Sequence, residues 1–224
     1  MAPRPVVLPP ATPAQCLLDI ASQYRYPTTV IITSTKEHFL GSLHEEVSMH
    51  EEQRAHDSPQ TPILCTSLLQ VAAARHIRVV FVPTVTHLRA YLSVFFKEDS
   101  RVPKPPRQGP GQESHPALVL YGFLWLHRDT SEWSAQGLGD SAAALVEAAA
   151  RNKLRAVVIE PTSDAGPPPD PKSSPVQEEH PLGERIPLLS EKKAGSWTAR
   201  TVELRRVLAR WFEIQPQTSH GSQQ

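Results

Sequence analysis

The sequence has few cysteines, few glycines and no long hydrophobic run, and each shortage excludes a class of protein. Its 2 cysteines, Cys16 and Cys65, form no CxxC pair, so neither a disulfide framework nor a cysteine zinc site is expected. We expect both to be small buried hydrophobic residues in a reducing compartment. No segment approaches the roughly 18 apolar residues of a membrane helix. The short proline-rich N-terminus lacks the pattern of a secretory signal, so we expect a soluble intracellular protein without membrane contact.

The sequence also has no excess of charge of either sign, since 23 Lys and Arg balance 23 Asp and Glu. The chain therefore has no global electrostatic signature of a nucleic-acid or membrane binder, and any such contact must come from a local patch. One basic patch lies near Trp197 and Trp211 and consists of Arg200, Arg205, Arg206 and Arg210. Guanidinium groups with nearby aromatic rings suit single-stranded nucleic acid, but an ordinary amphipathic edge element has the same composition.

Proline, in contrast, is abundant, with 23 residues concentrated in a few segments. Proline-rich polar stretches without apolar periodicity are typical of flexible chain. We therefore expect a single α/β domain over residues 14–214, with flexible or disordered segments at 1–13, 97–115, 163–185 and 215–224.

The segment from Pro116 to Pro161 predicts the fold class. The continuous apolar run 117–124 is typical of a strand covered on both faces. Leu138, Ala142 and Leu145 then repeat at helical spacing, and 156–159 is a second apolar strand. A strand, a crossover helix and a parallel strand form a right-handed unit, so we expect a three-layer α/β sandwich with a mainly parallel sheet.

The flanking segments extend this pattern. Strands are predicted at 28–33 and 77–82, and helices at 14–25, 36–56, 63–75 and from Thr84 onward. The helix 36–56 is expected to bury Phe39, Leu40, Leu43 and Val47 near its start, while its polar second half stands away from the core. The block 197–214 fits either a helix or an edge strand, and its spacing slightly favours the helix.

The loop after the first long strand is the place where an α/β protein binds phosphate. Here it contains Ser34, Thr35 and Lys36 but no glycine. A phosphate loop requires glycines so that successive backbone N–H groups can surround the anion. We therefore expect Ser34 or Thr35 to cap a helix, with no nucleotide or other cofactor bound.

Other candidate sites have incomplete patterns. His44, His50 and His56 are six residues apart, so they do not share a helix face as metal ligands should, and no metal site is expected. His127, Asp129 and either Ser131 or Ser134 could supply a base, an orienting group and a nucleophile, although no GxSxG elbow is present. The same loop, 128–137, contains Trp133 and Gln136, which we interpret either as a partner contact or as plain packing.

The order of elements and two of the strands resemble the RecA-type ATPase core. Thr33–Phe39 stands at the position of the phosphate loop, and Pro116–Gly122 resembles the hydrophobic Walker B strand, with Tyr121 in place of the acidic residue. The resemblance covers residues 27–159 and implies a RecA-like fold of the P-loop NTPase type without a functional Walker A segment. No catalytic residue is transferred, because the glycines and the carboxylate are missing.

Small RecA-like subunits of this kind occur among the recombinase paralogues of Shu-type complexes, with SWIM-domain partners, and in the Elongator subcomplex. The resemblance implies a non-catalytic nuclear subunit, or alternatively a cytoplasmic one, that promotes homologous recombination and DNA repair. Other RecA-like or SWIM-domain subunits and single-stranded DNA are its implied partners. Two alternatives remain open: an Elongator-type subunit acting in wobble-uridine modification of tRNA, and an α/β enzyme with an unrecognised site.

Overall fold

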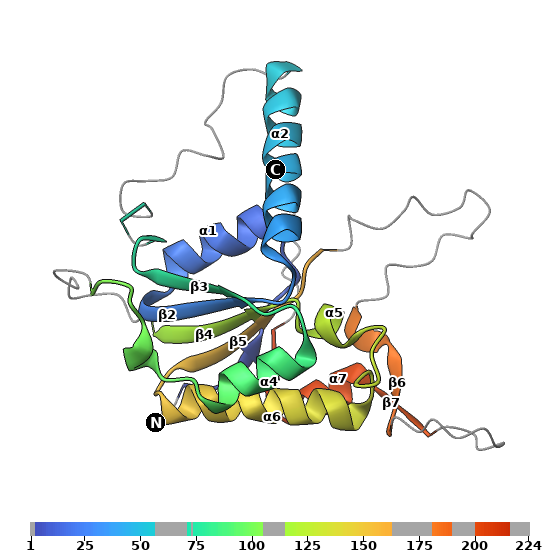
Figure 1. Cartoon of the computed structure of the whole chain (residues 1–224). Coiled ribbons are helices and arrows are strands. Elements are labelled where there is room, and N and C mark those ends of the chain that lie inside the picture. The colour runs from blue at the N-terminus through green and yellow to red at the C-terminus, as the bar shows by residue number, and fades with distance from the viewer. Residues whose placement is uncertain are drawn as a thin grey trace, which may run out of the picture.

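The computed structural model describes residues 3–56, 71–72, 74–104, 115–162, 181–189 and 200–215. Its centre is a six-stranded sheet in which every pairing is parallel, in the order β3-β2-β4-β5-β1-β8 (Figure 1). The strands are β1 Val6–Val7, β2 Arg25–Ile32, β3 Ile77–Phe81, β4 Pro116–Tyr121, β5 Arg155–Ile159 and β8 Glu213–Ile214. The predicted α/β class with a parallel sheet is confirmed.

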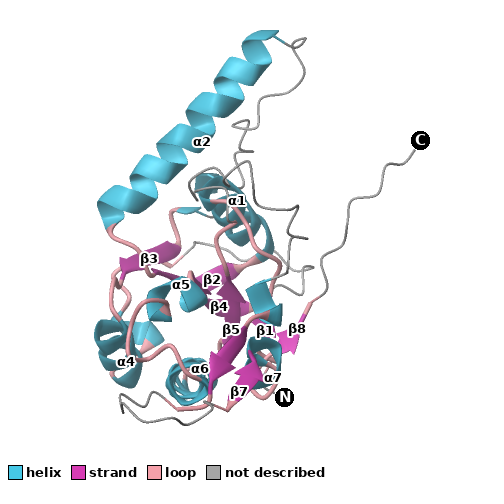
Figure 2. Cartoon of the chain, turned by 90° about the vertical axis from the view of Figure 1, so that its right-hand side faces the viewer, coloured by secondary structure: helices cyan, strands magenta, loops and turns pink. Residues whose placement is uncertain are grey.

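Helices cover both faces of this sheet (Figure 2). The α-helices are α1 Pro13–Gln23, α2 Lys36–His56, α4 Val85–Ser93, α5 Phe123–His127, α6 Ala135–Arg151 and α7 Leu204–Leu208. Two short 3-10 helices, η1 Lys97–Asp99 and η3 Pro181–Gly183, and a small antiparallel pair, β6 Arg185–Pro187 with β7 Thr201–Glu203, complete the described elements. Of the helices in these ranges, none combines the length and apolar character needed to cross a bilayer.

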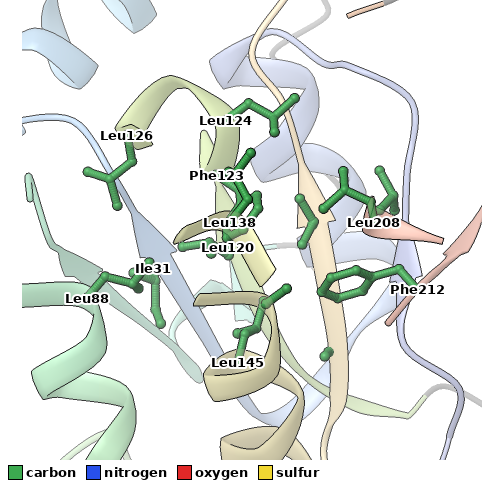
Figure 3. Packing of buried hydrophobic residues seen from close by; sticks show 14 of the residues in the cluster. Ile31, Leu88, Leu120, Phe123, Leu124, Leu126, Leu138, Leu145, Leu208 and Phe212 are labelled. Carbon is green, nitrogen blue, oxygen red and sulfur yellow. The ribbon is translucent and has the colours of Figure 1, made fainter. Parts of the chain in front are cut away.

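Alternation along the strands divides the core into two layers. Ile31 faces the larger cluster, to which α4, α6 and α7 contribute Leu88, Leu145 and Leu208 (Figure 3). Its neighbours Val30 and Ile32 face the smaller cluster, which includes Cys16 and Ile20 of α1 and Phe39 of α2. Because both faces are buried, β2 is apolar without alternation, as expected for the centre of a parallel sheet.

Helix α2 differs in part from the prediction. It spans 36–56 as predicted and extends well beyond the sheet (Figure 1). Only its first turn enters the core: Phe39 is buried, whereas Leu40 is 47% exposed and Leu43 and Val47, also predicted to be buried, are half-buried. Of the predicted helix 63–75, residues 71, 72 and 74 are helical, Arg75 already belongs to a turn, and the rest lies outside the described residues.

The N-terminal segment corrects the sequence prediction. Residues 1–13 are predicted to be a flexible leader, yet Val6 and Val7 form β1, which lies between β5 and β8. Val6 is fully buried there. A two-residue strand carries no periodic signal, because its burial comes from partners 150 residues or more distant in sequence.

Other predicted flexible segments also contain ordered structure. In 97–115, the backbone N–H of Lys97 donates to Asn152 Oδ1 at 2.9 Å, and η1 follows. In 163–185, Leu182 of η3 is buried and Arg185 begins β6. Gln215 donates its backbone N–H to Val7 O at 3.0 Å, while residues 216–224 lie outside the described residues.

Two further boundaries differ from the predictions. The apolar run 117–124 is not one strand, because β4 ends at Tyr121 and Gly122, with φ 88°, turns the chain into α5. Apolar character alone does not separate a buried strand from a buried helix. The block 197–214 is both alternatives in succession, since β7, α7 and β8 all lie within it.

Candidate functional site at the carboxyl edge of the sheet

The strand order defines where a ligand site is expected. From β2 the chain crosses to β3 on one side and later returns to β4 on the other. In doubly wound sheets, ligands bind at this switch point, beyond the carboxyl ends of the two strands. The segments that meet there are the Thr33–Lys36 loop after β2, Gly122 after β4 and Glu160 after β5.

Thr33 closes the space between β2 and β4. Its side chain is 4% exposed, and its hydroxyl lies 3.0 Å from Tyr121 O and 2.7 Å from Gly122 O, to which it donates. A Cβ atom on Gly122 would lie 2.4 Å from Thr33 Oγ1, so only glycine fits beneath this side chain. The backbone N–H of Gly122 donates to Ile159 O at 2.8 Å, which joins the end of β5 to the same contact.

The side chain of Glu160, which follows β5, lies against the first turn of α5. Its Oε1 accepts the backbone N–H of Leu124 at 2.9 Å, and the side chain is almost fully buried. Burial raises the pKa of this carboxyl to about 8, against the opposing effect of backbone N–H groups at Leu124, Trp125 and Phe123 and of the Arg128 charge. The protein's own carboxyl group therefore takes the position that a bound anion would need.

The neighbouring helix starts are capped by the chain as well. At α1, Glu46 accepts the hydroxyl of Thr12 and, at 2.9 Å, the backbone N–H of Ala14. At α2, Thr35 Oγ1 accepts the N–H of His38 at 3.2 Å, which confirms the predicted cap, and Lys36 is exposed beside it. Thr84 and Ser134 likewise cap α4 and α6.

Tyr121, the last residue of β4, forms a structural contact. Its hydroxyl donates to Ala11 O at 3.0 Å and so joins β4 to the segment after β1. Burial, with the nearby Cys16 and two glutamates, raises the pKa of this phenol. The position therefore supplies an aromatic ring, packed edge-on against Phe39, rather than a metal ligand.

His127 forms a buried network that sequence reasoning missed. Its Nδ1 lies 2.8 Å from Phe123 O and its Nε2 lies 2.8 Å from Ser141 Oγ. Because a carbonyl only accepts, Nδ1 carries the proton, and Nε2 accepts the hydroxyl of Ser141. Arg89 Nε donates to the same hydroxyl oxygen at 3.0 Å, and Arg89 Nη2 donates to Glu132 at 2.7 Å. Burial lowers the pKa of His127, in agreement with a neutral ring.

The loop does not assemble the nucleophile, base and orienting group whose incomplete pattern the sequence contains. Asp129 and Ser131 are exposed, while Ser134 caps α6, so neither serine meets His127. The serine that contacts His127 is Ser141, in the middle of α6. No sequence motif around Ser141 indicates this contact. Both His127 and Ser141 are fully buried, so their contact joins α5 to α6 instead of presenting a nucleophile to solvent.

The predicted partner-contact residues lie at the same end of α6. Trp133 is half-buried against the larger core cluster, and the guanidinium carbon of Arg128 lies 4.9 Å from its ring centroid. Gln136 is exposed, and its backbone N–H donates to Leu188 O at 3.3 Å. Trp133 therefore packs on the core, and the side chain of Gln136 is available to a partner.

The predicted nucleic-acid residues are all exposed and lie on successive segments near the C-terminal end of the described chain. Arg200 precedes β7, Arg205 and Arg206 lie on α7, and Arg210 follows that helix. Within the described ranges none of the four forms an ion pair. Trp211 is 38% exposed beside Arg210, whereas Trp197 lies outside the described residues.

No metal centre emerges from the described side chains, among which no three His, Cys, Asp or Glu are placed to hold an ion. His44 is exposed on α2, and the side chains of His50 and His56 are not among those described.

The contact between Thr33 and Gly122 gives a stability prediction. Gly122→Ala should lower the free energy of unfolding by about 3 kcal/mol, because alanine is strained at positive φ and its Cβ would meet Thr33 Oγ1. Gly139→Ala is the matched control: Gly139 lies inside α6 with nothing within 4 Å of the added atom, so stability should rise by up to about 1 kcal/mol. Urea unfolding of both variants measures the difference, and equal effects would contradict the close contact.

The burial of Glu160 predicts a pH dependence. A pKa raised from 4.5 to about 8 means that the folded state binds this proton more tightly than the unfolded chain does. The resulting stabilisation is complete below pH 4.5 and is lost as the pH rises through 8. Glu160→Gln cannot lose the proton, so its melting temperature relative to wild type should increase steadily from pH 5 to pH 8.5.

Two comparisons make this pH test specific. The titration of His127 is common to both proteins and cancels in the difference. Glu147→Gln changes a carboxyl group that is 77% exposed. The difference between its melting temperature and that of wild type should therefore stay constant from pH 5 to pH 8.5. A constant gap between Glu160→Gln and wild type would show that Glu160 is ionised throughout in the folded protein.

Comparison with models of known protein families gave no match, and comparison with curated proteins gave none at the required significance. The chain is an α/β protein with a six-stranded parallel sheet. At the carboxyl edge of this sheet, the side chains of Thr33 and Glu160 form hydrogen bonds with the backbone.

Proposed function

We propose that this chain is a non-catalytic RecA-like subunit that promotes homologous recombination and DNA repair by contacting other macromolecules. One observation carries the non-catalytic part: the switch point of the sheet holds the Thr33 hydroxyl and the Glu160 carboxyl, where a nucleotide-binding protein would hold phosphate.

The chemistry of this edge supports the same conclusion. A phosphate loop works through free backbone N–H groups and a cation. Here the first turns of α1 and α5 already donate backbone N–H groups to side-chain oxygens of Glu46 and Glu160, so these N–H groups are not free to bind an anion. Lys36 is the nearest cation in the loop, and it is exposed at the start of α2.

The RecA-like part of the proposal rests on the resemblance of two strands and on the adjacency of those strands in the sheet. Ile32 at the end of β2 is paired in register with Tyr121 at the end of β4. The order of the long strands occurs in unrelated α/β families, so it supports only the fold class. The function has to be argued from individual sites. The proposed partners are RecA-like or SWIM-domain subunits, with Gln136 and the adjoining Trp133 loop as the contact.

The first test concerns the nucleotide. ATP with Mg²⁺ should leave the melting temperature of the purified chain unchanged, because a ligand stabilises the folded state only if it binds that state. The control is the same measurement with Mg²⁺ alone. A shift of several degrees that Lys36→Ala abolishes would overturn the non-catalytic proposal.

The second test concerns the partner. Gln136→Tyr should reduce co-purification with a recombinase paralogue or a SWIM-domain protein and should sensitise cells to DNA-alkylating agents. Thr86→Tyr, at an exposed position on α4, is the matched control and should behave as wild type. Retention of both partners by Gln136→Tyr would reject this contact surface. A defect in wobble-uridine modification without alkylation sensitivity would replace the recombination role by an Elongator-type one.

A further inference from the structure

The opposite edge of the sheet carries a row of basic residues that no sequence motif indicates. Five strands have a cationic residue at or near their first position: Arg25 in β2, Arg78 in β3, Arg155 in β5, Arg4 before β1 and Arg210 before β8. The exposed His115 directly precedes β4. All six strands are parallel, so these residues gather at one edge, on the left of Figure 1.

Contacts between segments confirm that they share this edge. Arg155 Nε donates to Arg4 O at 3.0 Å, and the backbone N–H of Glu213 in β8 donates to Pro5 O at 2.9 Å. With neighbouring strands about 4.8 Å apart, the row from β3 to β8 extends over about 24 Å.

Helix ends and loops add further cations here. Arg151 ends α6, Lys153 follows it, and Lys97, Arg101 and Lys104 follow α4. The end of α6 meets this loop directly, since Arg151 Nη2 donates to Leu92 O at 3.0 Å and Asn152 Oδ1 accepts the N–H of Lys97.

Among the described residues, fewer carboxylates than cations lie at this edge. These carboxylates are Asp19, Glu98, Asp99, Glu147 and Glu213. Two ion pairs involve them, Lys97 with Glu98 at 3.8 Å and Arg151 with Glu147 at 3.7 Å, and in both the carboxylate is highly exposed. These pairs offset the charges of Lys97 and Arg151, whereas Arg101, Lys104 and Lys153 form no ion pair within the described ranges.

Helix dipoles explain only part of this arrangement. Parallel α/β folds place helix C-termini at the amino edge, where a cation such as Arg151 is stabilising. The dipole effect falls off within the last turn of a helix. It therefore accounts neither for Arg4 before β1 and Arg155 in β5 nor for Arg101 and Lys104 in the loop. The positive charge of this edge thus exceeds what the fold itself requires.

Aromatic rings accompany the charges. Phe96 is 49% exposed, and the guanidinium carbon of Arg151 lies 5.5 Å from its ring centroid. Trp211, also partly exposed, adjoins Arg210 at the other end of the row. Cationic side chains that follow a backbone, with rings on which bases stack, form the usual surface for a single nucleic-acid strand.

We propose that the amino edge of the sheet, from Arg78 and Phe96 to Arg210 and Trp211, is a binding surface for single-stranded nucleic acid. The proposal goes beyond the recombination role and does not depend on it, since it follows from charge and ring placement alone. It also differs from the C-terminal arginine patch, of which only Arg210 belongs to this edge.

The test uses the full chain and a fluorescein-labelled oligothymidylate of about 30 nucleotides, long enough to span the edge. The variant Arg101→Gln/Lys104→Gln/Lys153→Asn removes three exposed cations whose side chains make no hydrogen bond or ion pair within the described ranges. Asn is chosen at Lys153 because this residue has φ 57°, which asparagine tolerates. Fluorescence anisotropy should show affinity reduced by about tenfold or more and a salt slope lower by about 2.

The matched control removes the same charge elsewhere, as Lys36→Gln/Arg205→Gln/Arg206→Gln, and should change affinity less than twofold. A second variant tests the ring: Phe96→Ala should weaken binding several-fold, whereas Phe96→Trp should preserve it. Unchanged melting temperatures will show that the variants are folded.

Four outcomes would overturn the proposal: no binding of the oligonucleotide by wild type, equal losses in the two triple variants, tighter binding of a duplex of equal length, or preferential binding of vesicles containing phosphatidylcholine and phosphatidylserine in equal parts. None of them bears on co-purification with a recombinase paralogue, so this proposal and the proposed function can fail separately.

Discussion

The contact between Thr33 and Gly122 determines how the centre of this protein is built. The hydroxyl of Thr33 bonds to the carbonyls that end β4, and the positive φ of Gly122 turns the chain at once into α5. This turn brings the N–H of Leu124 to Glu160 and the ring of His127 beneath α6. The ends of three strands and the start of one helix thus depend on a single close approach.

That same contact decides which chemistry the carboxyl edge can perform. In other doubly wound proteins this edge binds the ligand through uncommitted N–H groups. Here those groups donate to side chains of the protein, and the buried Ser141–His127 pair is out of reach of solvent. The carboxyl edge therefore stabilises the fold, and functional surfaces have to be sought where charges and rings are exposed.

Sequence reasoning identified the elements whose signal is local. β2, β4 and β5 are long apolar runs, and α6 has regular helical spacing, so each is visible within a short window. β1 and β8 are two residues long and are strands only because distant partners bind them. The roles of Glu160 and Ser141 were missed for a similar reason: each is defined by a contact with α5, which itself lay hidden in an apolar run.

Charge shows the same limitation of sequence reasoning. The arginines from 200 to 210 are close in sequence, so they form a visible candidate site; in the fold they lie before β7, on α7 and in the following turn. The cations of the amino edge are separated by tens of residues and arise singly, at the starts of strands and the ends of helices. A net charge of zero conceals them further, because it sums over both edges. Because all strands of the sheet are parallel, their starts lie at one edge, and these scattered cations form a row there. The positive charge on which nucleic-acid binding would depend therefore results from the parallel arrangement of the strands.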